Sequence, residues 1–313
     1  MPFTAKSGKF NASINTVKFG TGDKAVKIGG ENVFPLYSFD AAIENAPKVG
    51  IEITDFGMEH EPECIKKYYE GCATLADMAR KAASMEGVDF LSFRMEGGDP
   101  NGANKSTEEL IGELKEIADA VDLPLVVCGC KNVEKDAELF SKAAEALNGK
   151  NAVILSAKEE NYKTVGAAAG LAYKQIVGAE SAVDINLAKQ LNVLISQLGV
   201  DSKSVVMNVG SAAVGYGFEY VISTMDRVKA AALQQGDANL QMPIITPVAS
   251  EAWGVKEAMA SETDAPEWGS QEERGIDMEV ETAMAVIAAG SNAVILKHPE
   301  SIKIISGLMK ELV

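Results

Sequence analysis

The sequence contains few of the residues that bind metals or carry redox chemistry. Among its 313 residues are two histidines and four cysteines, and no two cysteines have the C-x-x-C spacing of zinc knuckles and many iron–sulfur sites. A multi-histidine metal site is thereby excluded, and we expect no metal ligands in this chain. The cysteines are interpreted as reduced thiols. Cys128 and Cys130 flank Gly129 at the end of a predicted strand, where a functional thiol could lie, although burial in the core is favoured.

Basic residues and long apolar runs are also scarce. The 45 acidic residues outnumber the 29 basic ones, which gives a formal net charge of -16 and a sequence pI near 4.7. Such a surface repels phosphate backbones and anionic lipids, so we expect no nucleic acid and no membrane as a partner. The longest apolar stretches have the length of a strand, and the segment Met1–Lys6 lacks the apolar core of a secretory signal. These features predict a soluble, cytoplasmic protein.

Motifs of hydrolases and nucleotide-binding proteins are absent as well. The chain has no G-x-S-x-G, no Walker loop and no G-x-G-x-x-G after a first strand. We therefore predict no catalytic residue. His298, which lies between the last predicted strand and Pro299, is the best single candidate for acid–base chemistry, but a hydrogen-bonded structural histidine is at least as consistent with the sequence.

The pattern that is present alternates short β-branched runs with helical segments. Eight times, such a run ends in a loop rich in Gly, Asn and acidic residues, and a helical pattern usually follows. This order predicts a (β/α)8 TIM barrel, an α/β fold that places its chemistry on the loops after the strands. The predicted strands are Val49–Thr54, Phe90–Met95, Leu125–Gly129, Ala152–Ala157, Gln175–Ala179, Val205–Gly210, Ile244–Ala249 and Ala293–Lys297.

The N-terminal segment does not follow this alternation. Ser13–Phe19 and Ala25–Ile28 alternate polar and apolar residues on either side of Thr21–Lys24, which is typical of an antiparallel hairpin with a glycine in its turn. Such a hairpin can close the bottom of a barrel. We therefore divide a single domain into an N-terminal hairpin and bridge, residues 1–46, and a TIM barrel, residues 47–313.

Several helices can be predicted from apolar spacings of three and four residues. Ser106 starts one of them with a hydroxyl cap and a glutamate three positions later, Glu109. Gly199 ends another, as is typical just past a helix C-terminus. The predicted helices are Pro62–Met85, Ser106–Val121, Asp184–Leu198, Phe218–Gln234, Arg274–Ala289 and Glu300–Leu312.

The loops after the strands carry the candidate binding residues. The loop Glu96–Asn104 contains three glycines together with Asp99, Asn101 and Asn104, which suits either a ligand or an ordinary turn. The loop Asn208–Phe218 is the longest small-residue loop, and its exposed N–H groups could hold amides, carboxylates or phosphate. We expect it to lie flat against something bulky.

The strand-end motifs, taken together, carry a family resemblance. They are Asp99–Asn104, Val133–Asp136, Glu160–Lys163, Asp184–Asn186, Gly215–Tyr220, Glu251–Trp253, Trp268–Gly269 with Glu273–Ile276, and His298–Glu300. In this order and spacing, from about Asn15 to the C-terminus, the chain resembles the small subunit of the corrinoid iron–sulfur protein. The archaeal counterpart of that subunit is the delta subunit of the acetyl-CoA decarbonylase/synthase complex.

This resemblance implies a role and a set of partners. The barrel would form a 1:1 heterodimer with a large subunit that carries a [4Fe–4S] cluster and a corrinoid (cobalamin) domain. The cobalt would take a methyl group from methyltetrahydrofolate:corrinoid methyltransferase and deliver it to CO dehydrogenase/acetyl-CoA synthase in the reductive acetyl-CoA (Wood–Ljungdahl) pathway. The chain itself lacks the D-x-H-x-x-G string of a self-sufficient corrinoid domain. It would therefore cover the cofactor as a non-catalytic subunit.

Neutral groups at the strand ends agree with that role. The amide side chains of a corrinoid need uncharged donors and acceptors, which glycine backbones and asparagines supply. From motif position and strand-end location we predict the following contact residues: Asp99, Asn101, Asn104, Asn161, Asn208, Gly215, Tyr216 and Gly217.

Two alternatives remain at this stage. A pterin-binding TIM-barrel methyltransferase could hold the amidine edge of its substrate with Asp55, Asp99, Asn101 and the segment Asp184–Asn186. A purely structural subunit would instead use the barrel top, with Trp253, only to bury apolar surface.

Overall fold

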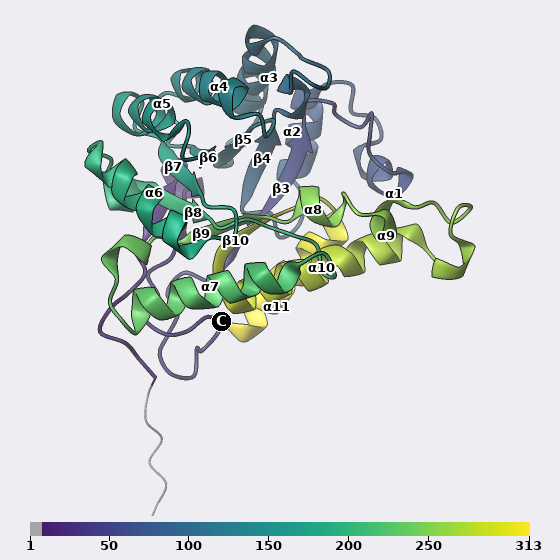
Figure 1. The fold of residues 1–313 in the computed structure, drawn as a ribbon. Coiled ribbons are helices and arrows are strands. Elements are labelled where there is room, and N and C mark those ends of the chain that lie inside the picture. Colours follow the sequence, from purple (N-terminus) through teal and green to yellow (C-terminus); the bar gives the residue numbers. More distant parts are fainter. Residues whose placement is uncertain (1–7) are drawn as a thin grey trace, which may run out of the picture.

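Eight parallel strands close into a barrel in the computed structural model, which describes residues 8–313 (Figure 1). Hydrogen bonding runs in sequence order from β3 to β10, and β10 pairs with β3 to complete the ring. The strands are β3 (Lys48–Thr54), β4 (Phe90–Arg94), β5 (Leu125–Cys128), β6 (Val153–Ala157), β7 (Ile176–Glu180), β8 (Val205–Asn208), β9 (Ile244–Pro247) and β10 (Ser291–Leu296). All eight predicted strands and the predicted (β/α)8 fold are confirmed. The segment Met1–Lys6, for which we expect no secretory signal, lies outside the described residues.

Helices surround the barrel and cover its outer face. The α-helices are α1 (Glu63–Lys66), α2 (Leu75–Ala83), α3 (Thr107–Ala120), α4 (Val133–Ala146), α5 (Tyr162–Val165), α6 (Ile185–Gln197), α7 (Phe218–Leu233), α8 (Ala249–Ala252), α9 (Lys256–Met259), α10 (Gln271–Ala289) and α11 (Pro299–Leu312). Short turns of other helical types are η1 (Gly22–Lys24), η2 (Lys67–Tyr69), η3 (Glu96–Gly98), η4 (Gly166–Ala172), η5 (Ser202–Ser204), η6 (Ala238–Leu240) and η7 (Pro266–Trp268). Within residues 8–313, none of these helices has the length and apolar character needed to cross a bilayer.

One predicted helix is wrong in its continuity. The segment Pro62–Met85 is interrupted between η2 and α2, because Gly71 adopts a left-handed conformation with φ of 84°. Thr74 then starts α2 afresh in a capping box, in which its hydroxyl accepts the N–H of Asp77 and the Asp77 carboxylate accepts the N–H of Thr74. The apolar spacing is right on both sides of the break. It carries no information about the break itself.

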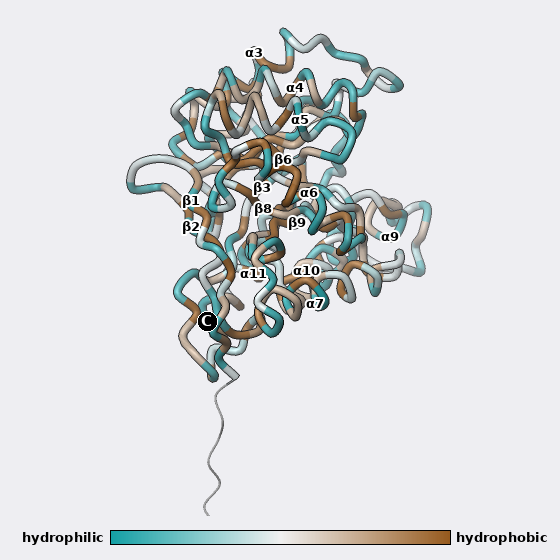
Figure 2. Tube along the Cα trace, turned by 60° about the vertical axis from the view of Figure 1, so that its left-hand side comes forward, coloured by the Kyte–Doolittle hydropathy of each residue, from teal (hydrophilic) through white to brown (hydrophobic). Residues whose placement is uncertain are grey.

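The N-terminal hairpin closes the bottom of the barrel. Strands β1 (Val17–Phe19) and β2 (Val26–Ile28) pair antiparallel, as predicted. Phe19 meets Phe90 of β4 edge to face, with ring centroids 5.5 Å apart. Apolar side chains of the hairpin thus form one cluster with the side chains that fill the barrel interior. A second, larger hydrophobic cluster lies between the strands and the helices. Hydrophobic residues accordingly concentrate around the strands (Figure 2).

The barrel interior changes from apolar to polar along its axis. Near the hairpin it contains Phe90 and other hydrophobic side chains, whereas towards the carboxyl ends of the strands it contains buried Glu52, Arg94 and Asn208. The apolar side chains at the bottom of the barrel need no hydrogen-bond partner. The buried charges at the top must be paired or hydrogen-bonded. The polar end is therefore where this barrel can bind a ligand.

Candidate functional site

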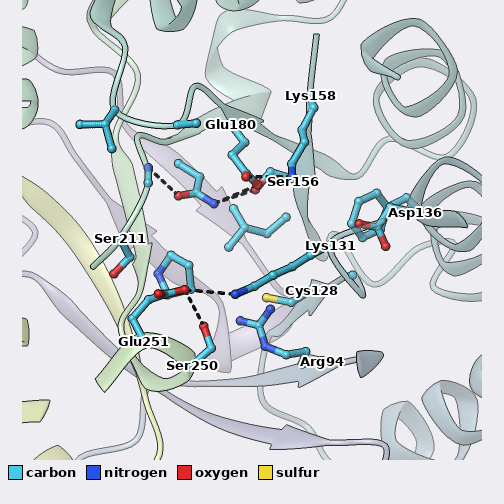
Figure 3. Close-up of a pocket in the computed structure, with 18 residues that line it drawn as sticks. Arg94, Cys128, Lys131, Asp136, Ser156, Lys158, Glu180, Ser211, Ser250 and Glu251 are labelled. Atoms are coloured by element: carbon cyan, nitrogen blue, oxygen red, sulfur yellow. Dashed lines mark hydrogen bonds and ion pairs between the residues drawn. The ribbon is translucent and has the colours of Figure 1, made fainter. Parts of the chain in front are cut away.

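Two adjoining cavities open at the carboxyl ends of the strands. The first has a volume of about 270 Å³ and the second of about 390 Å³. Both are lined by Arg94, Gly129, Lys131 and Ser250, so they form one continuous site. Figure 3 shows the first cavity, with labelled side chains converging on it from several strands and loops. We call the combined site the barrel mouth.

A buried ion pair lies where the two cavities meet. Arg94 of β4 donates from Nε to Oε2 of Glu52 on β3 at 3.0 Å, and its Nη2 lies 2.8 Å from the same oxygen. Burial disfavours the charged guanidinium, but attraction to the Glu52 carboxylate outweighs this effect and raises the pKa of Arg94 above its ordinary value. Arg94 is therefore a permanent cation, and guanidinium N–H groups beyond the two bound to Glu52 are available to a ligand.

Neutral hydrogen-bonding groups form the opposite wall of the first cavity. Asn208 donates from Nδ2 to the hydroxyl of Ser156 at 3.0 Å and accepts the N–H of Gly210 at 3.1 Å. The buried hydroxyl of Ser211 also lines this cavity and has no hydrogen-bond partner among residues 8–313. A buried hydroxyl without a hydrogen-bond partner destabilises the folded protein unless a ligand or water completes its hydrogen bonds.

Every basic side chain in the mouth is paired with an acid, and acids outnumber bases there as they do in the whole chain. Because Arg94 and Lys131 line both cavities, the mouth as a whole is lined by four bases and seven acids. Each base has a carboxylate partner within 3.3 Å. These ion pairs are Arg94–Glu52, Lys131–Glu251, Lys158–Glu180 and Lys297–Glu61. The other three acids, Glu96, Asp99 and Asp136, have no ion-pair partner among residues 8–313, so the mouth has more acidic than basic groups and no unpaired base.

Two of the predicted contact residues lie in the mouth. Asn208 lines the first cavity and Asp99 lines the second. Asn101 and Asn104 are exposed on the same loop as Asp99, and the backbone and side-chain N–H groups of Asn101 both donate to the Asp99 carboxylate. The loop therefore folds around Asp99, and both asparagines remain exposed to solvent.

The other predicted residues lie outside the linings of these two cavities. Asn161 is buried and braces its own loop, because it accepts the N–H of Lys158 at 2.8 Å and donates to the carbonyl of Val133 at 3.1 Å. Gly215 and Gly217 have φ of 87° and 78°, so they turn the chain into α7. Tyr216 between them is 48% exposed. The small-residue loop thus presents this tyrosine at the rim.

Sequence reasoning missed the central ion pair. Glu52 and Arg94 each lie in an apolar strand, at alternating positions that face the barrel interior. A charge at an inward strand position must find a partner, and two such charges of opposite sign near the ends of neighbouring strands predict a pair. That signal was present in the sequence.

His298 is buried and caps a helix. Its ring is fully buried and stacks on Trp253 with centroids 5.8 Å apart, and its Nδ1 accepts the N–H of Glu300 to cap α11. Burial lowers the pKa of His298 to about 4, so the ring is neutral at physiological pH. Cys128 and Cys130 are buried as well, which agrees with the packing interpretation. Burial raises the pKa of Cys128 to about 11 and that of Cys130 to about 12.

Solved structures share the fold of this chain. Dihydropteroate synthase from Thermus thermophilus superposes with a TM-score of 0.55 and 13% identity, covering 95% of this chain and 100% of the other. The enzyme from Vibrio fischeri gives a TM-score of 0.55 with 11% identity and covers 94% and 97%. At this identity the likeness concerns the barrel fold alone.

Sequence relatives are more informative. Acetyl-CoA decarbonylase/synthase complex subunit delta 1 of Methanosarcina thermophila is 29% identical over 94% of this chain and 67% of its own length. The delta subunit of Methanothermobacter thermautotrophicus is 31% identical over 95% of this chain and 75% of its own length. The model of the family described as CO dehydrogenase/acetyl-CoA synthase delta subunit matches residues 16–309. Because that match spans every strand of the barrel, the chain belongs to the CO dehydrogenase/acetyl-CoA synthase delta subunit family.

Proposed function

We propose that this chain is the small subunit of a heterodimeric corrinoid iron–sulfur methyl carrier in the reductive acetyl-CoA pathway. The barrel mouth covers the corrinoid that a large subunit carries. The observation that supports this most is the family match over residues 16–309, which includes all the loops that build the mouth. The relatives of this chain are named as delta subunits of acetyl-CoA decarbonylase/synthase complexes. The carrier would work in the cytoplasm.

The residues of the mouth fit a corrinoid in kind and in scale. Cavities of 270 and 390 Å³ are at the lower end of the volumes that enclose drug-sized ligands, so the macrocycle would lie across the mouth and only its amide arms would enter. Those arms are uncharged. Asn208, Ser156 and the unpartnered hydroxyl of Ser211 offer neutral donors and acceptors, and the paired charges leave no excess cation to attract an anion instead.

The division of labour between this chain and the large subunit follows from the chemical groups that this chain contains. The corrinoid cobalt supplies the chemistry of accepting and releasing a methyl group, and the [4Fe–4S] cluster and redox work belong to the large subunit. In this chain, Cys128 and His298 are buried neutral groups. The barrel binds the corrin edge, orients its amide arms and excludes water from them. Methyltetrahydrofolate:corrinoid methyltransferase and CO dehydrogenase/acetyl-CoA synthase would be transient partners.

A pterin-binding methyltransferase is the second candidate, and the shared fold favours it. One dihydropteroate synthase of this fold was solved with 7,8-dihydropteroate and superposes with a TM-score of 0.52. However, both carboxylate oxygens of Asp55 accept the N–H of Gly97, and Oδ2 also pairs with Lys105 at 3.1 Å. The Asp184 carboxylate caps α6. Of the carboxylates considered for the pterin, Asp99 alone lines the mouth.

The test is purification of the tagged chain from its native lysate, followed by the absorption spectrum and metal content of the eluate. A larger partner in 1:1 ratio, with a corrinoid band, cobalt and iron, supports the carrier subunit. A colourless protein that comes alone and binds methyltetrahydrofolate in calorimetry would refute it and favour the pterin enzyme.

A further inference from the structure

A lobe of the chain projects beside the barrel mouth between strand β9 and helix α10. We define it as residues 255–270, which include α9 and η7. It lies at the edge of the molecule next to the start of α10 (Figure 1). Met259 of the lobe lines the second cavity of the mouth. Whatever covers the mouth from this side therefore also meets the lobe.

One arginine holds the lobe in a fixed shape. Arg274 of α10 donates from Nε to the carbonyl of Glu257 at 2.8 Å, from Nη2 to the carbonyl of Ala260, and from Nη1 to the carbonyl of Gly269. A single guanidinium thus ties both ends of the lobe to α10. A surface that is ordered before binding loses little conformational entropy when a partner docks on it.

Large apolar side chains are exposed on and beside this lobe. Met259 is 37% exposed and Trp268 is 39% exposed. Tyr216 and Tyr220 of the neighbouring loop and helix are 48% and 66% exposed, and the Tyr216 hydroxyl donates to the Glu257 carboxylate at 2.6 Å. That bond joins the small-residue loop to the lobe. Exposed aromatic residues and methionine on one rim are typical of protein interfaces.

The charge of the lobe selects the kind of partner. It contains four acidic residues, Glu257, Glu262, Asp264 and Glu267, and one basic residue, Lys256. The Lys256 ammonium lies 5.8 Å from the centre of the Trp268 ring, so this charge is directed towards the tryptophan. A protein surface with basic residues around an apolar centre would complement this arrangement.

We propose that this lobe, together with Tyr216 and Tyr220, is the anchoring surface for the corrinoid-carrying large subunit, which docks through a basic surface with an apolar centre. The inference rests on the proposed function, because that function supplies the partner. Continuity supports this occupant, since Met259 belongs both to the lobe and to the mouth. Trp268 and Tyr220 supply exposed aromatic surface for this contact, and the acidic side chains of the lobe supply its negative charge.

The experiment measures the affinity of the large subunit for purified variants by calorimetry at low and high salt. Trp268→Ala removes the aromatic contact, and Glu262→Lys with Glu267→Lys reverses the charge. Phe39→Ser is the matched control, because Phe39 is 78% exposed at the opposite end of the barrel, beside Ser38, which bonds to the end of α11. Thermal unfolding and circular dichroism establish that each variant is folded.

We expect Trp268→Ala to weaken binding at least about tenfold and the charge reversal to weaken it and flatten its salt dependence, while Phe39→Ser stays within about twofold. If every variant binds the large subunit as tightly as the wild type does, the lobe proposal is wrong and the proposed function stands. An effect of the lobe variants on self-association of the chain, with binding of the large subunit unchanged, would also overturn it. Absence of wild-type binding would instead refute the proposed function.

Discussion

Arg94 and Glu52 form a buried ion pair, 2.8 Å between Nη2 and Oε2, at the junction of the two cavities of the barrel mouth. The two residues come from neighbouring parallel strands whose registers place Glu52 beside Ser92, two residues before Arg94. The pair keeps a permanent cation inside the protein and directs it towards the mouth. Removal of either residue would leave the other as an unpaired buried charge.

Removal of one member of this pair should be costly. Glu52→Gln leaves the Arg94 charge without its carboxylate, and we expect the free energy of unfolding to fall by about 3–5 kcal/mol in urea denaturation. The double variant Glu52→Leu with Arg94→Met should recover most of that loss, because it removes both charges. The exposed Glu59→Gln serves as the control. A loss for Glu52→Gln no larger than that of the control would contradict the pair's energetic role.

Three helical glycines should respond to the same substitution in opposite directions. A Cβ on Gly275 would lie 2.1 Å from the ring of Trp253, whereas a Cβ on Gly112 or Gly307 meets nothing within 4 Å. Alanine should therefore stabilise the protein by about 0.5–1 kcal/mol at Gly112 and Gly307, since it favours the helix. At Gly275 it should destabilise by roughly 1–3 kcal/mol. Thermal unfolding measures all three, and a gain at Gly275 would show that the contact is not tight.

His298 should make stability fall at mildly acidic pH. Its folded-state pKa of about 4 lies below the ordinary 6.5, so the unfolded chain binds a proton that the folded chain rejects. The neutral ring therefore contributes stability above pH 6.5 that is lost as the pH falls towards 4. Between pH 8 and pH 5 we expect a loss of about 2 kcal/mol.

The comparison with His298→Asn isolates this effect, because asparagine can still cap α11 but does not titrate. The nearby Glu272 carboxylate, 3.4 Å from Nε2, opposes the burial effect and is present in both proteins. Urea denaturation of the two proteins across this pH range should show the extra loss in wild type alone. Parallel pH profiles would contradict a neutral, buried His298.

The four cysteines should differ in reactivity. Cys128 and Cys130 are buried and their pKa values are raised to about 11 and about 12, so little thiolate forms at pH 8. Cys64 and Cys72 are partly exposed. Mass spectrometry after brief alkylation should find label on the latter pair, and on all four only after unfolding. Early labelling of Cys128 would mean that the mouth opens to its floor.

The barrel was predictable because its strands are β-branched runs of the right length, which bury hydrophobic groups on both faces. The hairpin was predictable from its alternation and from the glycine in its turn. The break before α2 was not, because Gly71 acts through one backbone angle that leaves the apolar spacing on either side intact. Local pattern thus determined the strands and most of the long helices, but it gave neither the break at Gly71 nor helix α4 (Val133–Ala146).

The site was less accessible to sequence reasoning because it is assembled from distant residues. Asn208 and Asp99 were found because they follow strands, and strand ends meet at the mouth. Asn161 follows a strand too, but its amide is used by neighbouring backbone groups, which no sequence spacing reveals. Glu52 and Arg94 are 42 residues apart and become partners only when β3 and β4 align.

Titration of the corrinoid-loaded large subunit with this chain, followed by the corrinoid absorption spectrum, tests the central claim most directly. The account predicts a spectral change that saturates at one chain per large subunit. Ser211→Trp, which fills the first cavity, should weaken the change at least about tenfold while thermal unfolding stays close to wild type. A large subunit whose corrinoid spectrum is unaffected by the wild-type chain would contradict the account.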